Sequence, residues 1–128
     1  ALARGIAAWF IRANENRYRK GAGMPLFAVM GLDHPPHSMD RRLAARDAHR
    51  AYVVANDDPI AFVGVCMDDE GNQCASLYVF EAENEQQVRD WLDREPFVQG
   101  GVYGQIVVRP FMLGLNRLPQ QDWPNKGG

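Results

Sequence analysis

Two arginines and a histidine recur at helical spacing in the first half of the chain. Arg42, Arg46 and His49 are separated by four and three residues, so one helical face would present two guanidinium groups and an imidazole. Asp33 follows an apolar run, and its carboxylate could accept a proton from one imidazole nitrogen and leave the other as a base. These residues predict acid–base chemistry on a small molecule, with His49 as general base and Asp33 as its orienting partner.

Other interpretations of these residues stay open. A planar guanidinium binds an anionic or enolate-like oxygen in two places, so Arg42 and Arg46 could hold such a substrate. Alternatively, a histidine near an aspartate is often a structural ion pair, and Arg46 could bridge to Asp47 or Asp40 at the surface. The residues by themselves indicate a site without deciding whether it is catalytic.

Two more histidines lie close to Asp33. His34 and His37 flank Pro35 and Pro36, and imidazole and carboxylate groups are ligands that suit zinc or iron. However, His-Pro-Pro-His is not a known ligand pattern, and the two prolines extend the backbone so that the side chains can diverge. We therefore expect no metal and no other cofactor.

The pattern of apolar and polar residues predicts a four-stranded α+β domain. Strands are expected over residues 26–30, 60–67, 75–80 and 102–109, and helices over about 38–55 and 84–95. Asn84 is the expected N-cap of the second helix, whose apolar stripe is Val88, Trp91 and Leu92. The small apolar residues of the first helix are expected to face the core; they are Leu43, Ala44, Ala48, Ala51 and Ala55.

The predicted sheet carries large apolar residues on both faces. Two helices can cover only one face of a four-stranded sheet. Leaving the other face in water would expose an apolar patch far larger than is normal for a monomer. The sequence therefore predicts a homodimer in which two sheets pack against each other.

Composition and charge limit the partners. The 128 residues carry a formal charge of -2, which makes nucleic acid a poor candidate. No apolar run approaches the roughly 18 residues needed to cross a membrane, and two cysteines are compatible with thiols in a reducing cytoplasm. We expect a cytoplasmic protein with a small-molecule ligand and no membrane partner.

The chain divides into three parts. Residues 1–23 carry a net charge of +4 and form an N-terminal extension, helical near its start or a mere appendage. Residues 24–111 form the domain. Residues 112–128, rich in Gly, Pro, Asn and Gln, form a C-terminal arm.

Three motifs resemble those of the YciI-like family. Residues 42–49 resemble its Arg-Leu-x-x-Arg-x-x-His signature. Residues 95–103 (EPFVQGGVY) and 107–111 (VVRPF) resemble its D-P-[YF]-x-x-A-G-[VL]-[YF] segment and its V-x-[PK]-F ending. The resemblance covers residues 25–111, with Gly100 in place of the usual alanine.

The resemblance implies a fold and a site. The fold would be ferredoxin-like, with βαββαβ order and an antiparallel four-stranded sheet, assembled as a dimeric α+β barrel. A pocket between the sheet and the first helix would hold a His-Asp pair, which maps onto His49 and Asp33. Ser76 lies at a serine position of the family and could donate a further hydrogen bond, while Tyr103 could close the wall of the pocket.

The resemblance also suggests an activity. A characterised member is a dehydrochlorinase acting on a chlorohydroxyhydroquinone, which favours a lyase or isomerase that transfers a proton or eliminates chloride on a small oxygenated ring. The alternative is a non-catalytic dimeric module that binds a metabolite.

Overall fold

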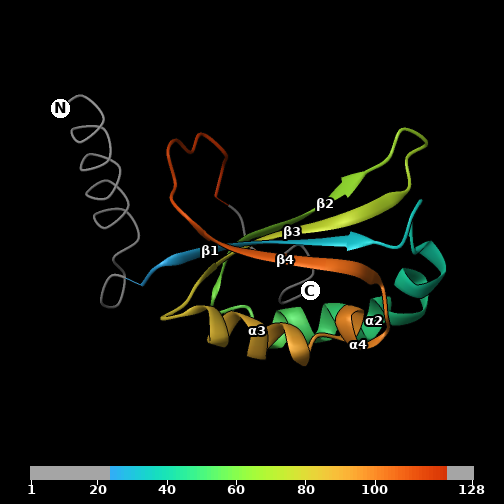
Figure 1. Ribbon diagram of the computed structural model, residues 1–128, viewed down its shortest axis with the longest axis horizontal. Coiled ribbons are helices and arrows are strands. Elements are labelled where there is room, and N and C mark those ends of the chain that lie inside the picture. The colour runs from blue at the N-terminus through green and yellow to red at the C-terminus, as the bar shows by residue number, and fades with distance from the viewer. Residues whose placement is uncertain (1–23, 121–128) are drawn as a thin grey trace.

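A four-stranded antiparallel sheet lies at the centre of the protein, whose computed structural model describes residues 24–120 (Figure 1). The strands are β1 (Leu26–Asp33), β2 (Ile60–Met67), β3 (Gln73–Glu81) and β4 (Tyr103–Phe111). Their spatial order is β2-β3-β1-β4, and every neighbouring pair is antiparallel. The predicted ferredoxin-like α+β fold is confirmed. The helix suggested near the N-terminus lies outside the described residues.

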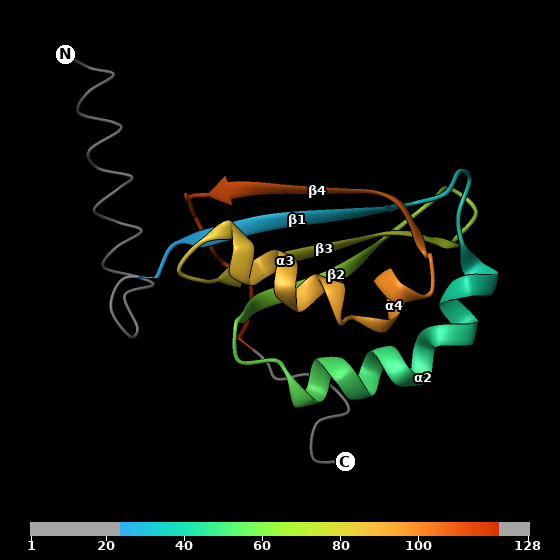
Figure 2. The same ribbon diagram turned by 60° about the horizontal axis from the view of Figure 1, so that its bottom comes forward.

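Three helices lie on the same side of this sheet in both views (Figures 1 and 2). They are α2 (Met39–Ala55), α3 (Glu85–Asp93) and α4 (Pro96–Gln99). Asn84 caps α3 as predicted, because its side chain accepts a hydrogen bond from the Gln87 amide. The short α4 was not predicted; Glu95 caps it and proline occupies its first turn. None of the helices within residues 24–120 is long and apolar enough to span a membrane.

The hydrophobic core lies between the sheet and the helices. The predicted apolar stripe of α3, formed by Val88, Trp91 and Leu92, is buried as expected. Aromatic rings dominate the contact, since Trp91 packs edge-on against Tyr78 and Phe80 of β3. Burial of these apolar surfaces holds α3 against the sheet.

The prediction for the face of α2 is wrong. Leu43 is 54% exposed, and the four alanines predicted to face the core are exposed as well. Arg42 and Val53 are the buried residues of this helix. The helix turns this way because the guanidinium of Arg42 meets a buried carboxylate on the sheet, whereas exposed alanines leave little apolar surface in water.

The opposite face of the sheet carries no helix within the described residues (Figure 1). Paired residues of β1 and β3 share this face, and several of them are only half-buried: Ala28, Met30, Leu32 and Leu77. Phe62 of β2 is 40% exposed on the same face, opposite Val79. The predicted apolar second face is therefore present, and its covering by a second copy stays a prediction.

Gly31 permits a close approach between β1 and the ring of Tyr103. A Cβ atom at Gly31 would lie 2.7 to 2.8 Å from three ring carbons of Tyr103, which is shorter than a normal contact. Because residue 31 has no side chain, the ring lies against the strand and its hydroxyl reaches Ser76 at 2.7 Å. The glycine thus positions a predicted site residue.

Gly31→Ala should destabilise the protein by about 1–3 kcal/mol, because the added methyl group forces the Tyr103 ring away from β1. Urea denaturation measures the change. Gly64→Ala in β2 is the matched control, since a Cβ there meets no atom within 4 Å. Equal stability of the two variants would contradict the steric argument.

Candidate functional site

A buried ion pair joins the end of β1 to the first turn of α2. Arg42 donates from Nε and Nη2 to the two carboxylate oxygens of Asp33, at 2.8 and 2.7 Å. The Ser38 amide donates to the same carboxylate at 2.9 Å. Burial by itself lowers the pKa of Arg42, but the hydrogen bonds and charge of Asp33 prevail and raise it above its usual value. Arg42 is therefore a permanent cation held at two of its nitrogens.

Ser76 and Tyr103 extend this pair across the sheet. Ser76 Oγ accepts hydrogen bonds from Arg42 Nη2 at 3.2 Å and from the Tyr103 hydroxyl at 2.7 Å. Desolvation raises the pKa of Tyr103 to about 12, so the phenol is neutral at pH 7. The structure thus brings together four of the predicted site residues, namely Asp33, Arg42, Ser76 and Tyr103.

His49 has a different carboxylate partner from the one predicted. Its Nδ1 contacts Oε1 of Glu95, whose side chain is fully buried, while Asp33 is occupied by Arg42 and Ser38. The reason is distance along the helix: His49 lies two turns beyond Arg42, about 10 Å further on. Glu95, in the connection from α3 to α4, lies at the level of His49.

Phe97 fixes the histidine ring and links the two ion pairs. The His49 and Phe97 rings stack with centroids 3.7 Å apart and an interplanar angle of 2°. Arg42 Cζ lies 5.3 Å from the centroid of the Phe97 ring and 5.8 Å from that of Tyr103. We call the connected set the buried polar cluster; its members are Asp33, Arg42, His49, Ser76, Glu95, Phe97 and Tyr103.

Glu95 was missed as a site residue because it was interpreted only as the end of a helix. A signal was present, since it lies in the EPFVQGGVY segment on which the family resemblance partly rests. Its Oε1 also accepts a hydrogen bond from the Phe97 amide at 3.0 Å, so the carboxylate caps α4 and holds His49 at once.

The remaining predicted residues lie outside these contacts. Arg46 is half-buried on α2 and has no ion pair within residues 24–120. His34 and His37 line a cavity of about 410 Å³ at the start of α2, together with Ser38, Met39, Asp40 and Arg41. No group of three or more metal-ligating side chains is assembled in the described part of the chain.

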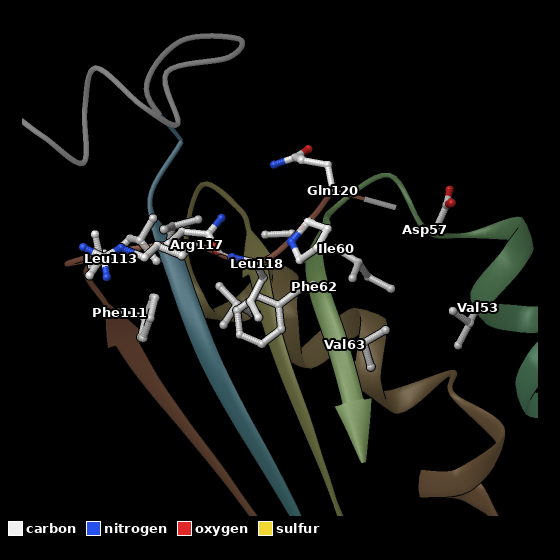
Figure 3. A pocket seen from close by; sticks show the side chains of 16 residues that line it. Val53, Asp57, Ile60, Phe62, Val63, Phe111, Leu113, Arg117, Leu118 and Gln120 are labelled. Atoms are coloured by element: carbon white, nitrogen blue, oxygen red, sulfur yellow. Dashed lines mark hydrogen bonds between the residues drawn. The ribbon is translucent and has the colours of Figure 1, made fainter. Parts of the chain in front are cut away.

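A larger cavity, of about 770 Å³, was not predicted from the sequence (Figure 3). It lies where β1 and β2 begin and β4 ends, and the segment after β4 forms one wall. Its lining is largely apolar and includes Leu26, Phe62, Val79, Phe111, Leu113 and Leu118. It contains no residue of the buried polar cluster.

Asp33→Asn should lower the free energy of unfolding by about 3–5 kcal/mol, because it leaves the buried guanidinium of Arg42 without a counter-charge. Urea denaturation at neutral pH measures the loss. Glu85→Gln is the matched control; it removes the solvent-exposed pair with Arg89 and should cost less than about 1 kcal/mol. If Asp33→Asn lowered the free energy of unfolding as little as Glu85→Gln does, the buried pair would contribute little to stability.

Comparison with known proteins identifies relatives of this chain. The YCII-related domain matches residues 26–112. An uncharacterized protein of Haemophilus influenzae is 32% identical over 94 residues, which cover 67% of this chain and 96% of that protein.

A solved structure from another bacterium matches this chain in both fold and sequence. It is the 5-chloro-2-hydroxyhydroquinone dehydrochlorinase of Burkholderia phenoliruptrix, in complex with 2,5-dihydroxybenzoquinone. It superposes with a TM-score of 0.62 at 25% identity, over 70% of this chain and 95% of that chain.

Proposed function

Because this chain belongs to the YCII-related family, we propose that it is a small-molecule enzyme of the lyase or isomerase type, acting by proton transfer on a small oxygenated ring. The observation that carries the proposal is the contact between His49 and the buried carboxylate of Glu95. The similarity to a dehydrochlorinase of hydroxylated rings supports the substrate class.

His49 would act as the general base. In the tautomer that carries its proton on Nδ1, this nitrogen donates to Glu95 and Nε2 carries the lone pair, and the carboxylate would stabilise the imidazolium that forms. Stacking on Phe97 limits rotation of the ring. The His49 side chain is 12% exposed, which leaves its edge accessible to a ligand, and within residues 24–120 no protein group binds Nε2.

A dehydrochlorination at this site needs no further reactant. In the keto tautomer of a chlorinated hydroquinone, a hydroxyl proton has moved to the carbon that bears chlorine. Nε2 of His49 then takes the proton of another ring hydroxyl, the O–H electron pair forms a C=O bond, the adjacent ring double bond shifts toward the chlorinated carbon, and chloride leaves with its bonding pair. An isomerisation would return the proton to another carbon. Both reactions use the same base.

Asp33 would act through Arg42 rather than on His49. Its carboxylate holds two of the guanidinium nitrogens, which leaves Nη1 of Arg42 as the nitrogen able to meet a substrate. We propose Arg46, half-buried one turn along α2, as a second contact for the substrate, with Ser76 and Tyr103 lining the site.

We propose a non-catalytic metabolite-binding module as the second candidate function. The cavity of about 770 Å³ favours it, because that cavity is large, mainly apolar and separate from His49. Such a module would bind a ligand saturably without forming a product.

His49→Ala should retain the fold and lower turnover by about 10²–10⁴-fold, because the general base is lost. Chloride release from 5-chloro-2-hydroxyhydroquinone measures turnover, and circular dichroism checks the fold. His37→Ala is the control, since His37 lies at the start of α2 outside the buried polar cluster. An unchanged rate for His49→Ala would remove His49 from the mechanism, and saturable binding without chloride release would favour the second function.

A homodimer, formed by packing the uncovered faces of two sheets together, is expected because that face carries half-buried apolar side chains. Light scattering at micromolar concentration should give twice the mass of the 14.4 kDa chain. Leu77→Asp, in the middle of this face, should shift the protein toward monomer, whereas Leu43→Asp on the exposed side of α2 should not. A monomeric wild-type protein would contradict the pairing.

A further inference from the structure

Two side chains on the helix-free face of the sheet are buried, although no helix covers them in the described part of the chain. Leu26 lies two residues before Ala28 in β1, so its side chain points to this face. Val79 pairs with Phe62 of β2 and lies on the same face. Leu26 and Val79 are each 2% exposed, whereas Phe62 is 40% exposed. Another part of the chain therefore covers this end of the face.

Residues 112–120, which we call the arm segment, provide that cover. After β4 the chain loops over the side of the sheet opposite the helices (Figure 1). The lining of the cavity of about 770 Å³ includes Leu26 and Val79 of the sheet. Leu113 and Leu118 of the arm segment line the same cavity. The arm segment thus shields one end of the face and leaves the middle of β1 and β3 half-buried.

The arm segment lies on the sheet without joining its hydrogen-bond ladder. β4 pairs with β1 only as far as Phe111. Among residues 24–120 no backbone hydrogen bond connects the arm segment to a strand, and the amide of Leu118 donates to the Asn116 side chain within the same segment. Leu115 and Leu118 are 69% and 72% exposed. A single chain therefore buries only part of the apolar surface of its arm segment.

The size of the helix-free face limits how well two sheets alone could pair. The sheet has four strands of eight or nine residues. With a spacing of about 4.8 Å between strands and about 3.3 Å per residue, its face measures about 500 Å². Specific protein interfaces bury about 800 Å² on each partner. Because the arm segment already hides one end of this face, the outer surface of the arm segment is needed to complete an interface of ordinary size.

A second copy of the chain is the partner that fits both surfaces. The exposed leucines of the arm segment and the half-buried apolar side chains of the sheet lie on the same side of the protein, so a partner that covers one also meets the other. In a two-fold dimer both subunits use the same patch, so each arm segment can contact the other protomer. A net charge of -2 disfavours an anionic membrane surface as the partner.

We infer that the arm segment is part of the homodimer interface, with Leu115 and Leu118 of each protomer buried against its partner. This inference rests on the homodimer proposed above and adds a second contact surface to it. Because both leucines also line the cavity of about 770 Å³, the partner would close that cavity from outside. Access to the cavity would then depend on the association of the two chains.

The test is the dimer dissociation constant of the full chain, measured by analytical ultracentrifugation over a concentration series. Leu115→Asp and Leu118→Asp should each raise this constant at least about tenfold, because each places a charge where the partner buries an apolar side chain. Leu43→Asp is the matched control; this leucine is 54% exposed on α2, on the opposite side of the sheet, and its replacement should leave the constant unchanged. Circular dichroism checks that all variants retain the fold.

Hydrogen exchange gives a second measurement that does not depend on the arm variants. Amides of residues 112–120 should exchange at least about tenfold more slowly in the wild-type dimer than in Leu77→Asp, the variant expected to be monomeric, because the partner shields them from water. Equal exchange in dimer and monomer would contradict the inference.

The arm contact and the sheet pairing fail in different ways. If Leu77→Asp weakens the dimer and neither arm variant does, the sheet pairing stands and the inference about the arm segment is wrong. If the arm variants weaken the dimer and Leu77→Asp does not, the arm contact stands and the sheet pairing is wrong. A monomeric wild-type chain that sediments with anionic vesicles, and loses this binding in Leu118→Asp, would assign the leucines to a membrane and overturn both.

Discussion

The bidentate pair between Asp33 and Arg42 is the constraint on which the rest of the site depends. Both side chains are buried, and a charge in that position is tolerated only with a partner and well-formed hydrogen bonds. The pair ties the last residue of β1 to the first turn of α2. It therefore sets which face of α2 meets the sheet. The direction of every other side chain on the helix is fixed by this rotation.

The rotation of α2 places His49 two turns further along, on the same inward face. There it meets Glu95 and stacks on Phe97, both from the connection between α3 and the last strand. A segment that reads as a simple helix end thus supplies both the carboxylate and the aromatic support of the histidine. The same carboxylate of Glu95 contacts His49 and caps α4, so it belongs both to the candidate site and to the fold.

The two faces of the sheet have different roles. The helix-covered face combines an aromatic core with the polar cluster near one end, where Gly31 allows Tyr103 to approach β1. The other face is apolar but only partly buried. The polar site and the uncovered apolar surface therefore lie on opposite faces of the same sheet.

Much of the fold could be predicted from the sequence because it depends on local patterns. Strand alternation, the Asn84 cap and the stripe of α3 are properties of neighbouring residues, and the structure has them where expected. The strand order matches the family resemblance. The sequence also indicated that Arg42 and His49 share one helical face, since their spacing alone requires it.

The partners of that face were decided by the tertiary structure. Asp33 and Glu95 are both carboxylates, and nothing in their own neighbourhoods tells which one will meet His49 and which one Arg42. That choice depends on where along α2 each carboxylate lies. Asp33 lies beside the first turn, where it meets Arg42, and Glu95 lies two turns further on, where it meets His49. The outward position of Leu43 has the same origin. A pattern of small apolar residues predicted a core-facing stripe, but leaving the buried carboxylate of Asp33 without Arg42 would cost more than exposing Leu43 and a few alanines.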